Sequence, residues 1–200
     1  MPRLVDHEAR RAEIVESTWR LIARNGFAAT TMRDIAEEMG VAHGALSHYF
    51  ASKDDLLLAS YEHVFERTDR RFAARRGRRR GLRALRLLAE EMMPLADEQR
   101  LEARIVMPFW ERSATSARFA AVHAEGMDRM AGQFEQFLHE AVADGEAVPH
   151  LDVRQTAKNL LSMLTGLQIL AVLMAQAYSP TVQRRMLRDF LADGVESNGA

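Results

Sequence analysis

Apolar residues recur along most of the chain at the three- and four-residue spacing of one helix face. A first helix is expected from Asp6, a plausible N-cap, to Arg24, where Asn25-Gly26 supplies a stop signal. Its buried side consists of Ile14, Trp19, Leu21 and Ile22. Residues 82–192 follow the same helical spacing. Their breaks fall near Pro94, at 114–116, at 144–152 and at Ser179-Pro180. No alternating strand pattern competes, so the predicted fold class is all-α.

Two short helices joined by a tight turn are expected soon after the first helix. Thr31 and Asp34 fit a capping box that would start one of them, and Gly40 would end it. The next helix, over residues 42–50, has only two obvious core positions, Leu46 and Phe50. Its other face carries small and polar groups that can approach a DNA groove closely. The pattern indicates either a helix-turn-helix or an ordinary pair of surface helices.

A fourth helix is expected to open at Lys53-Asp54-Asp55 and to reach Phe72. Its apolar stripe consists of Leu56, Leu57, Tyr61, Val64 and Phe65. Residues 75–83 then form a short arginine-rich loop with two glycines, which is typical of a domain boundary. This loop is either a solvated connector or a source of extra phosphate contacts. We therefore expect a helix-turn-helix domain at 1–52, a linking helix and basic loop at 53–80, and a second helical domain at 81–194.

The segment 160–174 is apolar on nearly every side. A membrane span is disfavoured because Ser162, Thr165 and Gln168 interrupt it and it falls short of roughly 18 to 20 uninterrupted apolar residues. Such a helix is either central in the core or covered by a second subunit. Together with a last helix over 181–192, it could form a four-helix dimer interface. The residues assigned to that interface are Leu164, Leu167, Leu170, Leu173, Met174, Met186 and Phe190.

Composition narrows the class of protein. The chain has 48% hydrophobic and 28% charged residues, which is ordinary for a soluble globular protein, and no cysteine, which excludes disulfides and thiolate chemistry. The N-terminus lacks an apolar signal segment, so a cytoplasmic protein is expected. The net charge is −1, but residues 1–86 carry 17 basic against 12 acidic side chains, whereas the remainder is acidic. This asymmetry suggests that one end meets a polyanion.

The segment from Ile35 to Lys53 reads Ile-Ala-x-x-x-Gly-Val-x-x-Gly-x-Leu-x-x-x-Phe-x-x-Lys and closely resembles the DNA-binding signature of TetR-family transcriptional repressors. Ser47 to Leu56, with Met93-Pro94-Leu95 and the stretch from Glu102 to Trp110, is most similar to the BetI-type branch. The resemblance implies a homodimer, with a three-helix DNA-binding domain followed by a helical ligand-binding and dimerisation domain. Two reader helices would enter successive major grooves of a palindromic double-stranded DNA operator, about 34 to 36 Å apart.

By position-for-position match, the DNA contacts are expected from Thr31, Arg33, His43, Gly44, Ala45, Ser47, His48, Tyr49 and Lys53. Thr31, Arg33 and Lys53 would hold phosphates, and the others would face base edges or backbone. The chain departs from the common family form at Ala42, where Ser or Thr is usual, and at Ser47, where Tyr is usual. The first change removes a helix cap, and the second leaves the operator preference open.

An inducer cavity could be lined by methionine and aromatic residues of the second domain, because methionine adapts to varied apolar ligands. The residues assigned to it are Met93, Phe109, Trp110, His123, Met127, Met130 and Met163. At helical spacing such residues can equally be plain core. Phe109 and Trp110 could also cage a quaternary ammonium group of a choline-type effector. Glu135 and His139 are a single pair and predict no metal site, and no cofactor is expected.

The resulting prediction is a homodimeric repressor that occupies its operator and releases it when an unidentified small molecule binds. An enzyme or carrier is disfavoured because the sequence has no nucleophile–base pair, phosphate-binding glycine loop or metal cluster. A regulator without an inducer, an activator and an unspecific DNA binder that relies on the arginine loop stay open.

Overall fold

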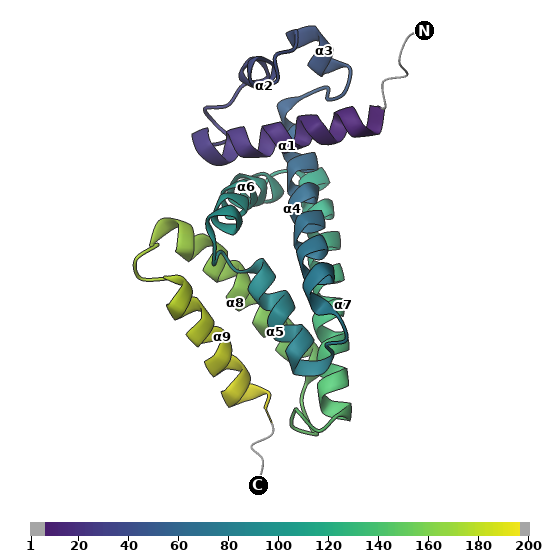
Figure 1. The fold of residues 1–200 in the computed structure, drawn as a ribbon, viewed down its shortest axis with the longest axis vertical. Helices are drawn as coiled ribbons and strands as arrows, with labels where there is room; N and C mark the ends of the chain where they lie inside the picture. The colour runs from purple at the N-terminus through teal and green to yellow at the C-terminus, as the bar shows by residue number, and fades with distance from the viewer. Residues whose placement is uncertain (1–6, 197–200) are drawn as a thin grey trace.

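The computed structural model describes residues 7–196, and within this range the chain is helical, with no strand beyond one isolated bridge between Ala147 and Glu196 (Figure 1). The helices are α1 (His7–Asn25), α2 (Met32–Glu38), α3 (His43–Ser47), α4 (Lys53–Arg76), α5 (Gly81–Met92), α6 (Asp97–Ser113), α7 (Ala117–Ala143), α8 (Val153–Leu173) and α9 (Pro180–Gly194). The predicted all-α class is confirmed. Asp6, the expected N-cap of the first helix, lies outside the described residues.

Local capping explains where the short helices begin. Thr31 accepts a hydrogen bond from the Asp34 backbone and Asp34 reaches back to the Thr31 backbone, so the predicted capping box of α2 is confirmed. Ala42 precedes α3 without any side-chain cap, and α3 is correspondingly short. α4 is four residues longer than expected, because nothing after Phe72 breaks a helix until Gly77, which has φ +53°.

Three hydrophobic clusters hold the molecule together. The first lies within the N-terminal unit, formed by α1, α2, α3 and the start of α4, and includes Ile14, Ile35, Leu46, Phe50 and Leu56. The second joins α1 to α4, α6 and α7 through Trp19, Ile22, Leu57, Tyr61, Ile105, Phe109 and Phe119. The third is the core of the body and draws on α4, α5, α7, α8 and α9. Because the second cluster spans both parts, the position of α1 depends on how α4 and α6 pack.

The arginine-rich loop lies far from α3. α4 has 24 residues and is therefore about 36 Å long, and it carries the loop to the end of the body opposite the helix-turn-helix (Figure 1). Several of its arginines have partners within the body. Arg75 pairs with Glu91, Arg80 pairs with Asp144 at 3.0 Å, and Arg79 donates to carbonyl oxygens at the end of α4. The loop is thus distant from α3, and several of its arginines are paired with residues of the body.

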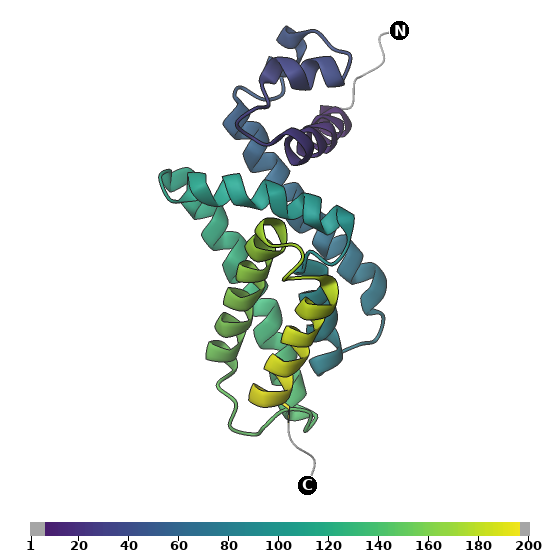
Figure 2. The same cartoon turned by 90° about the vertical axis from the view of Figure 1, so that its left-hand side faces the viewer.

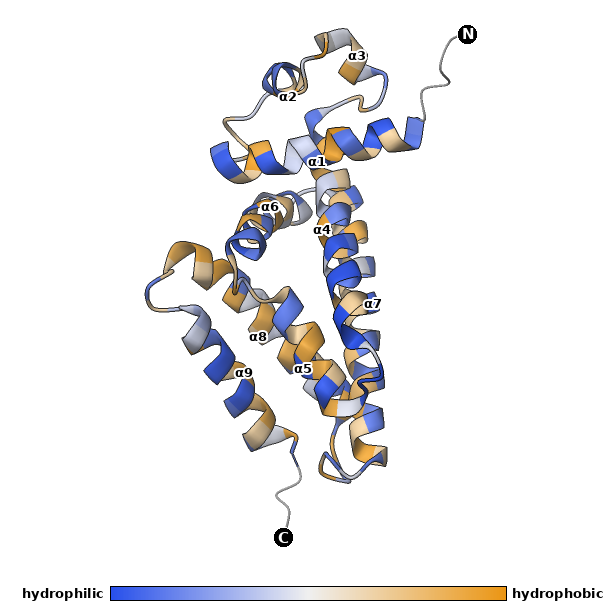
Figure 3. Cartoon of the chain, in the orientation of Figure 1, coloured by the Kyte–Doolittle hydropathy of each residue, from blue (hydrophilic) through white to orange (hydrophobic). Residues whose placement is uncertain are grey.

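α8 and α9 lie side by side on one face of the body (Figure 2). α8 is long and apolar enough to cross a membrane by length and composition, but a third of the relevant window is buried inside the protomer. The end of α8 and the turn that follows it are coloured hydrophobic in Figure 3. There Leu173 is 64% and Met174 52% exposed. Apolar surface of this kind is typical of a face that is covered by something else.

Candidate nucleic-acid interface and ligand cavity

α3, the predicted reader helix, lies at the tip of the molecule, away from the body (Figure 1). Leu46 and Phe50 are 1% and 2% exposed and seat it on the core of the N-terminal unit. Gly44, Ala45, Ser47 and His48 are exposed on its outer side, and Tyr49 is half-buried behind them. His43 begins the helix. The structure thus places the exposed part of the predicted reader set on one short helix.

The side chains expected to hold phosphates surround α3. Arg33 is exposed on α2 and pairs with Glu37 at 3.0 Å. Thr31 uses its hydroxyl in the capping box, where its hydrogen bonds hold the pKa of Asp34 below the usual range. Lys53 Nζ lies 4.1 Å from the centre of the Phe27 ring and 3.5 Å from the Ala28 carbonyl oxygen, and partial burial lowers its pKa. Lys53 therefore sits against its own domain in this structure.

A small cavity, with a volume of about 40 Å³ open to the centres of water-sized molecules, lies where α4, α5, α6, α7 and α8 meet. Its lining is mostly apolar and aromatic, with a few polar groups, as is usual for small-molecule sites. It consists of Tyr61, Val64, Phe65, Thr68, Glu91, Met92, Gln99, Glu102, Ala103, Val106, Trp110, Met127, Met130, Thr165 and Gln168.

Tyr61 anchors the aromatic wall. Its ring stacks on Phe109 at 3.5 Å between centroids and 3° between planes, and it meets Phe65 edge-on at 5.0 Å. Its hydroxyl lies 2.8 Å from Nδ1 of His123. Burial raises the pKa of Tyr61 and lowers the pKa of His123, so both groups are neutral near neutral pH. The hydroxyl and the neutral imidazole therefore share one hydrogen bond, whose donor is set by the tautomer of His123.

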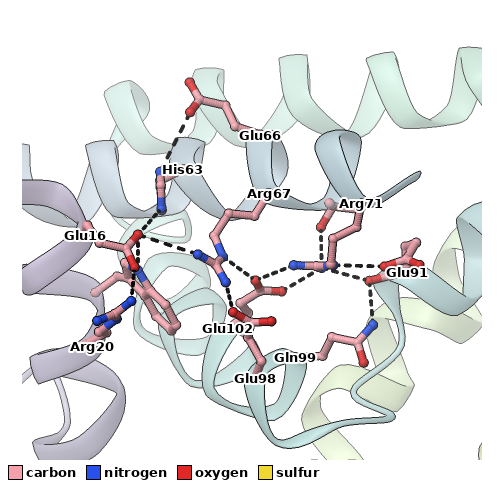
Figure 4. A network of polar contacts seen from close by, with 12 residues as sticks. Glu16, Arg20, His63, Glu66, Arg67, Arg71, Glu91, Glu98, Gln99 and Glu102 are labelled. Atoms are coloured by element: carbon pink, nitrogen blue, oxygen red, sulfur yellow. Dashed lines mark hydrogen bonds and ion pairs between the residues drawn. The ribbon is translucent and has the colours of Figure 1, made fainter. Parts of the chain in front are cut away.

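The polar wall is formed by two buried carboxylates and their arginines (Figure 4). Glu102 accepts hydrogen bonds from Arg67 Nε at 2.9 Å and from Arg71 Nη1 at 2.7 Å. Glu91 accepts a hydrogen bond from Arg71 Nε at 2.9 Å. Burial alone would lower the pKa of Arg71, but its hydrogen bonds and charge contacts with Glu102 and Glu91 outweigh this and raise it. The carboxylates of this wall are thus paired with arginines of the same chain.

Comparison with known families decides what these two sites belong to. The model of bacterial regulatory proteins of the TetR family matches residues 14–60, and the model of the C-terminal part of BetI-type transcriptional repressors matches residues 81–196. The chain belongs to the BetI-type branch of the TetR family.

Individual relatives agree with this assignment. The transcriptional regulator BetI of Burkholderia ambifaria is 27% identical over 96% of both chains, and PksA of Bacillus subtilis is 46% identical over 71 residues, or 35% of each chain. A transcriptional regulator of Saccharomonospora viridis, solved in complex with choline, superposes with a TM-score of 0.87 at 24% identity and covers 96% of this chain and 100% of that one. A TetR regulator of Haloarcula marismortui reaches 0.85 at 18% identity, over 94% of this chain and 100% of that one.

The structure brings only part of the predicted ligand set to the cavity of this TetR-family chain. Trp110, Met127 and Met130 line it. Phe109 and His123 lie behind Tyr61, where they position its ring and hydroxyl. The other two residues, Met93 and Met163, belong to the body core or pack against it. Phe109 and Trp110 do not face each other across a ligand, because consecutive residues on a helix point about 100° apart.

Sequence reasoning assigned no ligand role to Tyr61, Phe65 or the carboxylates Glu91 and Glu102. A signal for the carboxylates was present. Glu91 follows Ala84 and Leu88 at helical spacing, and Glu102 precedes Val106 and Phe109 in the same way. Both acids thus fall on the buried face of their helix, where a charged group needs a partner or a function.

Two of the residues predicted for a dimer interface are not on the surface. Leu164 and Leu167 are 0% and 1% exposed and pack into the core of the protomer, so they cannot contact a second copy. α8 is the inner helix of its pair and turns this side toward α7. Leu173 and Met174 are exposed, and Leu170, Met186 and Phe190 are half-buried.

Proposed function

We propose that this TetR-family protein is a homodimeric repressor that binds a palindromic operator through α3 and releases it when a small molecule occupies the cavity. The observation that carries the proposal is that Tyr61 belongs both to the cavity and to the hydrophobic cluster that holds α1 in place. It lines the cavity, and it lies in the same hydrophobic cluster as Trp19 and Ile22 of α1. A ligand that displaces this ring acts directly on the seat of the DNA-binding unit.

α4 is the mechanical link in this proposal. Its first turn follows the reader directly and is held to the body by ion pairs of Arg112 with Asp54 and Arg118 with Asp55, both at 2.7 Å. A small shift of α4 against α6 and α7 therefore moves α3. A ligand that prefers the shifted state by roughly 1 to 3 kcal/mol lowers the operator affinity about 5- to 150-fold.

A choline-type cation is the ligand class that fits the cavity best. The aromatic rings of Tyr61, Phe65 and Trp110 line the cavity and could hold a quaternary ammonium group, and the carboxylates of Glu91 and Glu102, which are paired with arginines, line the same cavity. The regulator of Saccharomonospora viridis that shares the fold was solved with choline. Choline is therefore the first inducer to test.

The dimer would form through α8 and α9, whose shared face carries the exposed apolar residues Leu173 and Met174. A two-fold axis through this face would present two readers to successive grooves. Because the operator is chromosomal, the proposal places the protein in the cytoplasm.

The test is a titration of the protein against DNA from upstream of its own gene and against a scrambled duplex of equal length. A specific repressor prefers the native duplex, keeps that preference as salt rises, and loses it when choline is added. His48→Ala, on the exposed reader face, should abolish the preference, whereas His150→Ala, exposed in the loop between α7 and α8, should not. Equal, salt-sensitive binding to both duplexes would instead support an unspecific DNA binder.

A further inference from the structure

A continuous chain of ion pairs connects the cavity wall with the first helix of the DNA-binding unit (Figure 4). It runs from Glu91 on α5 through Arg71 on α4 to Glu102 on α6, and from there through Arg67 on α4 to Glu16 on α1. The last ion pair joins Arg67 Nη1 to Glu16 Oε2 at 3.5 Å. Four helices therefore share one set of charges.

The inner part of this chain is buried. The side chains of Glu91 and Glu102 are 2% and 5% exposed, and that of Arg67 is 16% exposed. A buried carboxylate that loses its counter-charge is strongly disfavoured, so a change at one link forces its neighbours to adjust. Surface ion pairs, in contrast, break independently and with little effect.

Each end of the chain touches a different functional part. At the inner end, Glu91 and Glu102 line the cavity. At the outer end, Glu16 accepts from Trp19 Nε1 at 3.0 Å and lies 2.9 Å from His63 Nε2, and the Arg67 guanidinium lies 4.9 Å from the centre of the Trp19 ring. Trp19 is 2% exposed and belongs to the cluster that seats α1 on α4 and α6.

We propose that Arg67 reports the occupancy of the cavity to α1. A cationic group bound beside Glu102 competes with Arg67 for this carboxylate, and Arg67 then turns toward Glu16 and Glu98, its other two partners. The new balance of charge displaces Glu16 and with it Trp19 and the N-terminal unit. This inference rests on the proposed function, since it describes how the same cavity regulates DNA binding.

Trp19 provides a direct readout. The chain has two tryptophans, and Trp110→Phe, which keeps an aromatic ring at the cavity, leaves Trp19 as the only tryptophan; calorimetry compares the choline affinity of this background with that of the parent. Choline is the probe, with its binding followed by calorimetry and its effect by Trp19 emission and by operator affinity. We expect choline to shift the emission and to lower the operator affinity about 5- to 150-fold. In Glu16→Gln, choline should still bind, but both responses should disappear.

Glu13→Gln is the matched control, because Glu13 lies one turn before Glu16 on α1, is exposed and pairs only with Arg10 among the described residues. It should respond to choline as the parent does. If Glu16→Gln responds to choline as fully as Glu13→Gln, the proposed role of Arg67 is wrong.

A second arm needs neither ligand nor DNA and separates this inference from the proposed function. Glu102→Gln imitates a neutralised carboxylate and should shift Trp19 emission, and this shift should vanish when Glu16→Gln is added. Additive effects of the two substitutions would overturn the inference even if choline proves to be the inducer. If choline does not bind, the proposed ligand is wrong. The comparison of Glu102→Gln with the double variant still tests the role of the ion pairs. Should Glu102→Gln prove unfolded by circular dichroism, Arg67→Lys takes its place, because an ammonium cannot bridge two carboxylates as a guanidinium does.

Discussion

Tyr61 lines the cavity and also packs in the hydrophobic cluster that holds α1 against α4 and α6. Tyr61→Phe keeps the ring stacked on Phe109 but removes the hydroxyl that is hydrogen-bonded to His123. We expect a loss of about 0.5 to 1.5 kcal/mol in the free energy of unfolding, measured by urea denaturation. Tyr178→Phe is the control, since the hydroxyl of Tyr178 makes no hydrogen bond within residues 7–196, and it should change stability by less than about 0.5 kcal/mol. Equal losses in the two variants would contradict the assigned role of the Tyr61 hydroxyl.

His123 should make the stability depend on pH. Burial holds its pKa below the usual 6.5, so the unfolded chain takes up a proton more readily than the folded one. The contribution is fully present above pH 6.5 and is lost as the pH falls from there toward the folded-state pKa. We expect a thermal midpoint that drops between about pH 7.5 and about pH 5.5. The drop should be smaller in His123→Asn; if it is unchanged, other histidines cause it.

For single residues, the sequence predicted which side chains are exposed better than it predicted which side chains line the cavity. Ser47 and His48 proved exposed and Leu46 buried because the helical period alone decides which side a residue takes. The residues that line the cavity were harder to predict, because the position of the cavity depends on which helices meet. Met93 and Met127 look alike in sequence, but Met93 is 0% exposed in the core whereas Met127 lines the cavity.

Some helix boundaries follow from local capping residues. The Thr31 capping box starts α2, and Gly77 ends α4. Ala42 cannot cap α3, which extends only from His43 to Ser47 and is the shortest of the described helices.

Restoring the cap should stabilise the reader. Ala42 has the extended backbone of an N-cap, with φ −65° and ψ 141°, so serine fits without rearrangement. We expect Ala42→Ser to raise the free energy of unfolding by about 1 kcal/mol, measured by urea denaturation. Ala45→Ser, the same change inside α3, should not stabilise, because serine in a helix interior is no better than alanine. If both variants stabilise the protein equally, capping is not the cause.

At the scale of the whole molecule, the sequence predicted two helical parts but not how they are arranged. Nothing local shows that α4 carries the arginine loop to the end of the body opposite α3 (Figure 1), or that α6 both lines the cavity and packs against α1. Such relations arise from packing between helices that are distant in sequence. They also determine which apolar positions of α8 face inward, as Leu164 does, and which face outward, as Leu173 does.

The exposed apolar positions at the end of α8 lead to a prediction about dimer formation. Leu173 lies at the end of α8 and is 64% exposed in the protomer, beside Met174 and the half-buried side of α9. If this surface is the dimer interface, Leu173→Glu places a charge where a second copy removes water. Burying such a charge costs about 2 to 3 kcal/mol or more, which corresponds to roughly a 100-fold rise in the dimer dissociation constant. Sedimentation velocity over a range of concentrations measures this constant directly.

Ala124→Glu on α7 is the control for this substitution. Ala124 is also exposed but lies on a different helix from the proposed interface, so the added charge should leave the dimer intact. In the monomeric Leu173→Glu variant each reader binds its half-site alone, so operator affinity should fall although α3 is untouched and the protein remains folded. A Leu173→Glu protein that stays dimeric would move the interface away from this face of α8. The two readers would then need a different two-fold axis to reach successive grooves.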